Sequence, residues 1–298
     1  MGEMIDAREL IRRQALPLIE KIRWAKERIW DFHDVFGGMI YISFSGGKDS
    51  TVLLHLVRSI FPQTEGVFVD TGLEYPEIKV FVRSIENITW LKPKMPFNKV
   101  VDKYGYPIIS KETASKIDEI RNTKSDYLRN KRLFGDANGN GKISDKWKYL
   151  IDAPFKISAR CCSVMKKSPL RIYETKTKKR PLIGTMAIES SLRKMAYLKN
   201  GCNALDGLHP HSQPLSFWLE KDIWEYIKIN NLKYSKIYDM GYDRTGCMFC
   251  MFGVTHDASD LFSKNRFEKM KETHPKEYNY CINKLGCGKV LDYINVNY

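Results

Sequence analysis

Hydrophobic and polar positions follow a pattern that predicts helices and strands in alternation. Within residues 1–36, apolar side chains recur every three to four positions, which predicts helices, with Pro17 separating two of them. The apolar, β-rich run 39–44 then predicts a strand, and residues 51–57, apolar on most faces, predict a buried helix. A strand, a loop and a buried helix together form the repeating unit of parallel sheets.

The alternation continues further along the chain. Strands are predicted at residues 66–70, 88–91 and 181–184, and helices at residues 75–85 and 221–229. Because alternating strands and helices favour a parallel sheet covered on both faces, we expect an α/β fold with a doubly wound parallel sheet.

Composition narrows the class of protein. The chain has 298 residues, of which 43% are hydrophobic and 28% charged, which argues against disorder and against a coiled-coil rod. No apolar stretch approaches the roughly 20 residues needed to cross a bilayer. The N-terminus lacks the basic and apolar regions of a signal peptide, so we expect a cytoplasmic protein without membrane contact. The net charge of +14 fits a phosphate-rich partner or a solvated lysine-rich surface.

A glycine-rich loop follows the first predicted strand, at the position where α/β sheets bind ligands. Glycines let a backbone approach a phosphate closely, and the amides and dipole of the next helix favour an anion. The lysine adds a mobile cation and the serines add hydroxyl donors. A plain glycine turn with a helix cap is the alternative. The loop consists of Ser45, Gly46, Gly47, Lys48, Asp49 and Ser50.

The loop is not a Walker A loop. Ile42 stands where the first glycine of that motif would be, and Asp49 follows Lys48 where Ser or Thr is needed. The sequence therefore predicts a phosphate loop of another kind.

The seven cysteines favour metal binding or thiol chemistry over a disulfide framework. Cys161 and Cys162 are adjacent, whereas Cys247 and Cys250 form a C-x2-C pair, and two such pairs can complete a four-thiolate site. Adjacent cysteines are less usual for structural zinc, so the spacing favours a 4Fe-4S cluster over zinc. Unrelated buried thiols are the remaining alternative.

Several motifs resemble the phosphoadenosine phosphosulfate (PAPS) reductase family. The glycine loop is similar to the SGGxDS pyrophosphate loop of ATP pyrophosphatases, and residues 70–77 are similar to the family's VDTG-x-x-x-PE stretch. Residues 161–170 resemble CC-x-x-RK-x-x-PL, with Met165 in place of Arg, and residues 214–250 carry further motifs in the family's order. The resemblance points to an SGGKDS branch with a CC…CxxC cluster motif, which includes the DndC-like enzymes of DNA phosphorothioation. It implies an adenine nucleotide alpha hydrolase-like fold.

The resemblance implies contacts to a nucleotide and to metals. Asp70, Thr71 and Gly72 would lie beside the nucleotide, and Asp49 would help to hold a Mg²⁺ ion that neutralises the leaving pyrophosphate. In the relatives, the CC and CxxC pairs hold a 4Fe-4S cluster. The implied cluster ligands here are Cys161, Cys162, Cys247 and Cys250.

A second anion site is implied by residues 184–193, which resemble the family's G-x-R-x-x-[ED]-S-x-x-R motif. Met186 replaces the first Arg, but Glu189, Ser190 and Arg193 match. Arg193 would pair bidentately with phosphate or sulfate, and a solvated helix face is the alternative. The predicted catalytic residues are Lys48, Asp49 and Arg193.

The other cysteines have no assigned role. They are Cys202, Cys281 and Cys287. Cys287 lies roughly where reductases of the family carry a catalytic Cys in an ECG-[LI]-H tail, but Gly286 and Lys289 replace the Glu and the His. A thiolate favoured by nearby lysines and a free surface thiol are the two interpretations.

The basic segment, residues 156–199, contains twelve Lys and Arg against two Glu, a net charge of 12 − 2 = +10. A small nucleotide hardly requires this charge, whereas a phosphate backbone would. DNA or tRNA is therefore an expected partner of this segment.

These features together predict an iron-sulfur ATP pyrophosphatase of the PAPS reductase family that adenylates an acceptor and supports sulfur transfer, of the DNA or tRNA thiolation type. A sulfur donor protein is a further expected partner. One alternative is an adenylyl-sulfate or PAPS reductase releasing sulfite, against which the intact loop lysine and the incomplete C-terminal tail argue. Another is a non-catalytic subunit that binds nucleotide and nucleic acid.

The expected organisation is an N-terminal helical segment at residues 1–36, a nucleotide-binding α/β domain at residues 37–200, and a C-terminal region at residues 201–298 that completes the cluster site. The prediction requires a glycine loop open to a triphosphate and four sulfur atoms gathered in one place.

Overall fold

The computed structural model describes residues 5–257 and 264–298, which form two compact units. The first unit contains the described residues up to Asp70, together with Tyr75–Leu91 and Leu170–Thr245. The second unit contains Thr71–Glu74, Lys92–Pro169 and the described residues from Gly246 onward. The boundaries expected near residues 36 and 200 both fall inside the first unit, which includes the N-terminal helices and a sheet with strands on either side of residue 200.

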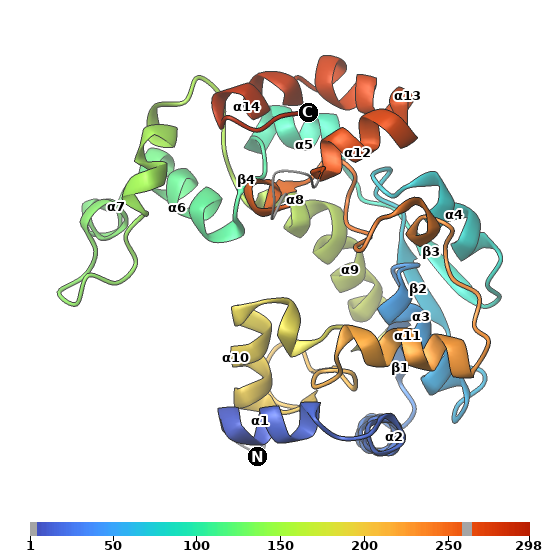
Figure 1. Cartoon of the computed structure of the whole chain (residues 1–298). Coiled ribbons are helices and arrows are strands. Elements are labelled where there is room, and N and C mark those ends of the chain that lie inside the picture. Colours follow the sequence, from blue (N-terminus) through green and yellow to red (C-terminus); the bar gives the residue numbers. More distant parts are fainter. Residues whose placement is uncertain (1–4, 258–263) are drawn as a thin grey trace. The chain divides into compact units, whose positions relative to one another are not determined.

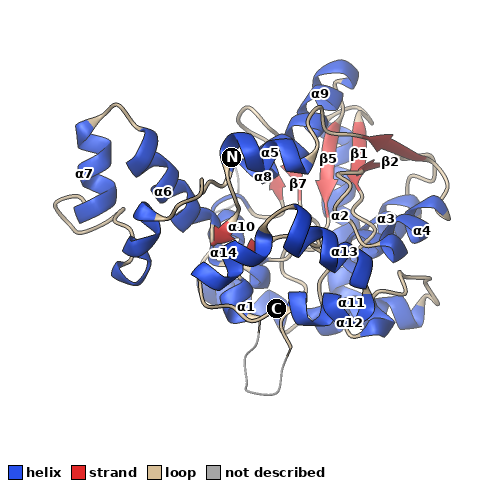
Figure 2. Cartoon of the chain, turned by 90° about the horizontal axis from the view of Figure 1, so that it is seen from above, coloured by secondary structure: helices blue, strands red, loops and turns tan. Residues whose placement is uncertain are grey.

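A six-stranded sheet forms the centre of the first unit (Figure 2). The five strands from β3 to β7 are paired in parallel, and β6 alone pairs antiparallel, at the edge beside β7. The predicted α/β fold is therefore confirmed, with a short edge hairpin that the sequence pattern did not indicate. The strands in spatial order are β3 (Ile88–Leu91), β2 (Gly66–Val69), β1 (Ile40–Ser43), β5 (Arg180–Ile183), β7 (His211–Ser212) and β6 (Asn203–Ala204).

Helices flank the sheet (Figure 1). The predicted break at Pro17 is confirmed, since α1 ends at Gln14 and α2 begins at Leu18. The side chain of Asp6 accepts a hydrogen bond from the amide of Glu9 and so caps α1. The helices of this unit are α1 (Ala7–Gln14), α2 (Leu18–Val35), α3 (Lys48–Arg58), α4 (Pro76–Arg83), most of α9 (Ser168–Thr177), α10 (Ser191–Asn200) and α11 (Glu220–Ile229), with 3-10 turns at Ala187–Glu189 and Tyr238–Met240.

The core of the first unit lies between the sheet and these helices. Helix α3 is apolar on most faces, and it packs against β1, β5, α2 and α11, as its sequence predicts. Tyr41 on β1 packs edge-to-face on Tyr173 of α9 at 5.1 Å between ring centroids, and its hydroxyl donates to Glu174. This packing holds β1 against α9.

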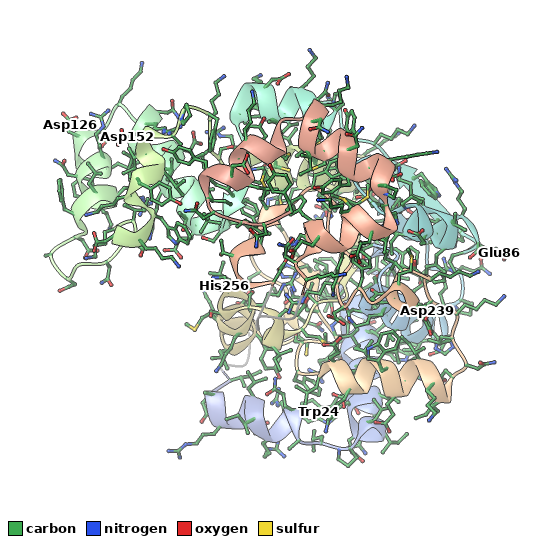
Figure 3. The ribbon with its side chains drawn as sticks, turned by 45° about the horizontal axis from the view of Figure 1, so that its top comes forward. Trp24, Glu86, Asp126, Asp152, Asp239 and His256 are labelled. Atoms are coloured by element: carbon green, nitrogen blue, oxygen red, sulfur yellow. The ribbon has the colours of Figure 1, made fainter. Side chains whose placement is uncertain are left out.

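The second unit is mainly helical, and a two-stranded parallel sheet joins its central and C-terminal segments. Figure 3 labels Asp126 and Asp152 in its α6 to α7 region, where the guanidinium of Arg121 donates to four backbone carbonyls between residues 150 and 155. The elements are α5 (Phe97–Tyr104), β4 (Ile108–Ile109), α6 (Lys111–Asn122), α7 (Asp126–Phe134), α8 (Arg160–Cys162), β8 (Met251–Phe252), α12 (Arg266–Thr273), α13 (Pro275–Asn279) and α14 (Cys287–Tyr293), with 3-10 or π turns at Asp145–Asp152, Ser163–Lys167, Val254–His256 and Tyr280–Lys284.

None of the helices within the described residues is both long and apolar enough to span a bilayer.

Candidate functional site

The glycine loop connects β1 to the first turn of α3 and is tightly enclosed. Gly46 has a φ of +74°, and a Cβ there would lie 2.7 Å from Val82 and 2.9 Å from Ile78 of α4. A Cβ at Gly184, just after β5, would lie 2.9 Å from the carbonyl oxygen of Asp49. Glycine is therefore required at both positions, because a Cβ would overlap branched side chains of α4 at Gly46 and the backbone of Asp49 at Gly184.

The two serines of the loop bond mainly to the loop itself. The hydroxyl of Ser50 donates to the carbonyl of Gly47 at 2.9 Å and accepts the amide of Ser45 at 3.2 Å. The hydroxyls of Ser45 and Ser50 are 3.0 Å apart. These contacts hold the turn in one shape, so the serines organise the loop in this structure.

Lys48 provides a backbone and a side-chain hydrogen-bond donor to the loop, and both are occupied. Its amide donates to the hydroxyl of Tyr238 at 2.8 Å. Its buried ammonium donates to the carbonyl of Asp243 at 2.7 Å and pairs with Glu220 at 3.1 Å. The loop is therefore not the open cradle that the sequence predicts, because oxygen atoms of the same chain fill it. Their presence shows that the loop attracts oxygen ligands.

Asp49 carries an unsatisfied carboxylate oxygen. Its Oδ1 atom is buried and has no hydrogen-bond partner among the described residues. Burial is the main cause that raises the pKa of this carboxyl to about 6; Lys48 lowers the pKa, whereas Glu189 and Glu220 raise it. Above that pH the carboxylate is ionised, and an unpaired oxygen of this kind suits a hard divalent cation.

The polar side chains of Asp70 and Thr71, which follow β2, already have partners close by in the sequence. Asp70, at the end of β2, pairs with Lys79 of α4 at 2.7 Å. In the second unit, the amide and the hydroxyl of Thr71 both donate to the carboxylate of Glu74, at 2.9 and 2.6 Å, across the turn that contains Gly72. Nucleotide contacts of Asp70, Thr71 and Gly72 remain predictions.

The residues of the second anion motif lie together at the start of α10. Glu189 accepts the amide of Met186 at 2.7 Å and forms an ion pair with Arg193. Ser190 caps the helix by accepting the amide of Arg193 at 3.3 Å. Because Glu189 also acts on the pKa of Asp49, this helix start lies near the glycine loop. An anion bound to Arg193 would have to compete with Glu189.

The four predicted cluster ligands all belong to the second unit and are free thiols. The thiol of Cys161 donates a hydrogen bond to Cys162, which lowers the pKa of Cys162 to about 6 and raises that of Cys161. Charges on Cys247 and Cys250 also raise the pKa of Cys161, so both pairs are close enough to interact. Burial raises the pKa of Cys247 to about 11.

The surroundings of these thiols are basic. The charge of Cys247 raises the pKa of Lys166, which also forms a hydrogen bond with that sulfur. The hydrogen bond from Cys161 is the largest cause that lowers the pKa of Cys162, and the nearby charges of Lys111 and Lys166 lower it further. The donor set thus suits a soft metal. However, in residues 5–257 and 264–298 no three His, Cys, Asp or Glu side chains are arranged to hold a metal ion. Cluster binding remains a prediction.

The remaining cysteines are buried. Cys281 and Cys287 are both 0% exposed and are hydrogen-bonded to each other, and Cys202 is buried in the first unit. Cys287 is therefore not a free surface thiol, because α14 packs it into the interior of the second unit.

Sequence analysis missed Tyr238, Asp243 and Glu220 as neighbours of the loop. Tyr238 belongs to one of the family motifs, but that motif gives no indication that its hydroxyl reaches Lys48. In the second unit, the sequence places Lys166 in the cysteine motif and in the basic segment, but it does not indicate that Lys166 lies beside Cys247.

Comparison with known proteins identifies the family. Residues 39–252 match the phosphoadenosine phosphosulfate reductase domain. The chain belongs to this family. The family resemblance drawn from the loop and the cysteine motifs is thereby confirmed, and the protein belongs to an enzyme family of sulfur metabolism. Membership of the DndC-like branch remains a prediction.

The relatives include named reductases and an uncharacterized protein. An adenosine 5'-phosphosulfate reductase of Geobacillus kaustophilus is 28% identical over 237 residues, 78% of this chain and 81% of that protein. An uncharacterized protein of Methanocaldococcus jannaschii is 26% identical over 256 residues, 83% of this chain and 47% of that protein. The chain thus spans about half the length of the second relative. A solved phosphoadenylyl-sulfate reductase of Candida auris, in a phosphate complex, has a TM-score of 0.44 and 16% identity, covering 83% of this chain and 98% of that chain.

Proposed function

We propose that this PAPS reductase family member splits ATP between its α and β phosphates and transfers AMP to an acceptor, in support of sulfur transfer. The observation that carries the proposal is the buried Lys48, whose amide and ammonium both attract oxygen ligands at the N-terminus of α3. A reaction that releases pyrophosphate needs donors at the point where negative charge grows, and preorganised donors of this kind are the strongest form of such stabilisation.

Asp49 is the residue proposed to hold Mg²⁺, since its buried Oδ1 lacks a partner among the described residues. When bound, the ion would neutralise charge on the phosphates. Arg193 would contact the nucleotide after exchanging Glu189 for a phosphate oxygen, and it retains 40% side-chain exposure to do so. Glu189, Ser190, Asp70, Thr71 and Gly72 are proposed to border the same nucleotide.

The cysteine pairs are proposed to hold a 4Fe-4S cluster, with zinc as the alternative. The lowered pKa of Cys162 and the basic surroundings favour thiolates, which are the form that binds metal. A cluster would supply a metal centre able to bind sulfur or transfer electrons.

We expect anaerobically prepared protein to contain about four iron atoms per chain, as a 4Fe-4S cluster requires. The variant Cys247→Ser should lose that iron, because it removes one of the proposed ligands. The matched control, Cys202→Ser, alters a buried thiol of the first unit and should keep it. Iron and visible absorbance measure the result, and one tightly held zinc without iron would contradict the cluster.

DNA or tRNA is the proposed acceptor, bound in part by the basic segment, with a sulfur donor protein as a further partner. The segment is divided between the two units after Pro169. Some of its cations already have partners, since Arg160 pairs with Asp118 and Lys179 with Glu65. The other cations supply the charge for a phosphate backbone. The free thiols fit the reducing cytoplasm proposed as the location.

The decisive assay is pyrophosphate release from labelled ATP under anaerobic conditions, with and without DNA or tRNA. We expect Lys48→Ala to lower the rate by at least about 100-fold, since it removes a donor at the leaving group. The matched control is Lys228→Ala, which alters an exposed lysine of α11 and should leave the rate unchanged.

The same preparation tests the second candidate, which the named reductase among the relatives favours. Sulfite release from adenylyl sulfate or PAPS with thioredoxin, without pyrophosphate release from ATP, would replace the proposed function by a reductase. The absence of both products would leave a non-catalytic binding subunit.

A further inference from the structure

The glycine loop is filled by a single short segment of the first unit, which we call the strap and define as residues Tyr238–Thr245. The hydroxyl of Tyr238 accepts the amide of Lys48 at 2.8 Å and lies 3.2 Å from the hydroxyl of Thr245. The carbonyl of Asp243 accepts the ammonium of Lys48 at 2.7 Å. The strap thus supplies an oxygen atom to each nitrogen of Lys48.

The strap also covers the backbone at Gly47. A Cβ at this position would lie 2.6 Å from the hydroxyl oxygen of Thr245 and 3.1 Å from that of Tyr238. The space over Gly47 is the space through which a phosphate would reach the loop amides. Phosphate and strap therefore compete for the same place.

Glu220 of α11 completes this arrangement from outside the strap. Its carboxylate lies 3.1 Å from the ammonium of Lys48, and the side chain of Lys48 is only 6% exposed. A buried ammonium without partners would be strongly destabilising. The carbonyl of Asp243 and the carboxylate of Glu220 provide these partners, as phosphate oxygens would in a complex.

Aromatic side chains pack against the first residue of the strap, Tyr238. Tyr238 packs at right angles to Trp224, with 5.5 Å between ring centroids, and the ammonium of Lys48 lies 5.2 Å from the Tyr238 ring. Gly241, in the middle of the strap, has a φ of +81°, and no atom lies within 4 Å of where its Cβ would be. The strap therefore has a glycine at which it can change direction.

We propose that the strap and Glu220 act as an internal mimic of a polyphosphate, so that the loop admits only ligands with two linked phosphates. A single phosphate could replace the strap oxygen at one nitrogen of Lys48, but when the strap moved, the amide would lose the Tyr238 hydroxyl or the ammonium would keep Glu220 alone. Two linked phosphates replace both sets of oxygen atoms together. This selectivity for a diphosphate group deepens the proposed function and rests on it where the ligand is ATP.

The test is the affinity for inorganic pyrophosphate, measured by calorimetry in wild type and in Tyr238→Phe. Removing the hydroxyl deletes one competing hydrogen bond of the closed state, so pyrophosphate should bind about fivefold more tightly. Tyr41→Phe is the matched control, because it removes the hydroxyl of another buried tyrosine of the first unit, and the partner of that hydroxyl, Glu174, lies outside the strap. Its affinity should equal that of wild type. Weaker binding to Tyr238→Phe would make Tyr238 a phosphate ligand and overturn the proposal, and unchanged binding would overturn it as well.

Two further measurements separate this inference from the proposed function. Wild type should bind pyrophosphate at least tenfold more tightly than inorganic phosphate, and equal affinities would contradict the polyphosphate mimic. Without any ligand, hydrogen exchange at the Lys48 amide should be faster in Tyr238→Phe than in Tyr41→Phe. If ATP is not cleaved but both of these results are obtained, the proposed function is wrong and the proposed role of the strap is supported. If Lys48→Ala abolishes pyrophosphate release from ATP but Tyr238→Phe behaves as wild type, the strap fails alone.

Discussion

Replacement of Lys21 by methionine is expected to lower the free energy of unfolding by about 3–5 kcal/mol. Lys21 of α2 is 0% exposed, and its ammonium lies 2.5 Å from the carboxylate of Asp222 on α11, whose side chain is 4% exposed. It also donates to the carbonyl of Gln14 at 2.8 Å. Methionine keeps the shape of the side chain but leaves the carboxylate buried and without its cation. Urea unfolding followed by circular dichroism measures the loss.

Two variants show whether charge is the cause. Lys21→Met combined with Asp222→Asn removes both charges and keeps a side-chain oxygen for the amide of Leu219, so most of the lost stability should return. Arg23→Met breaks an exposed ion pair with Glu20 on the same helix and should change the stability by less than about 0.5 kcal/mol. A loss below about 1 kcal/mol for Lys21→Met would contradict the expectation.

Alanine at Gly105 is expected to destabilise the second unit by about 3–5 kcal/mol. Gly105 ends α5 with a φ of +100°, and a Cβ there would lie 2.2 Å from the carbonyl carbon of Lys156 and 2.6 Å from the amide nitrogen of Ile157. Those atoms belong to a backbone bridge in which Tyr106 pairs with Ile157, so they cannot move aside cheaply. The added methyl group must break that bridge. Hydrogen exchange of amides in the second unit measures the loss even if the two units open separately.

Gly139→Ala serves as the comparison for this prediction. Gly139 also has a positive φ, +74°, but no atom lies within 4 Å of its Cβ position. Only conformational strain acts there, and we expect a loss of about 1 kcal/mol. Equal losses in the two variants would show that the contact with Lys156 is unimportant.

The elements that could be predicted from the sequence are those whose pattern is local. Residues 39–44 carry the run of β1 and residues 51–57 the buried face of α3, and both elements formed as expected. The strands β4, β6, β7 and β8 have two residues each. A pair of residues has no periodicity, so only pairing with a neighbouring strand identifies these elements as strands.

In the candidate site, too, the features that could be predicted are those whose residues are close together in the sequence. The glycine loop and the cysteine pairs are contiguous in sequence, and their spacing carries their chemistry. Tyr238 and Asp243 stand 190 and 195 positions from Lys48, where sequence spacing conveys nothing about proximity. The carboxylate of Glu74 is bound by Thr71 through a local turn, yet sequence alone could not say whether Thr71 would face a ligand or its neighbour.

Gly246 separates the strap from the first cysteine of the C-x2-C pair, with one residue between Thr245 and Cys247. Consecutive Cα atoms are only about 3.8 Å apart, so displacement of Thr245 has to be absorbed within that link or transmitted to the thiol. A Cβ at Gly246 would meet no atom within 4 Å, and glycine has the widest choice of backbone angles. If the strap moves as proposed, Gly246 would allow Thr245 to shift without displacing the thiol of Cys247.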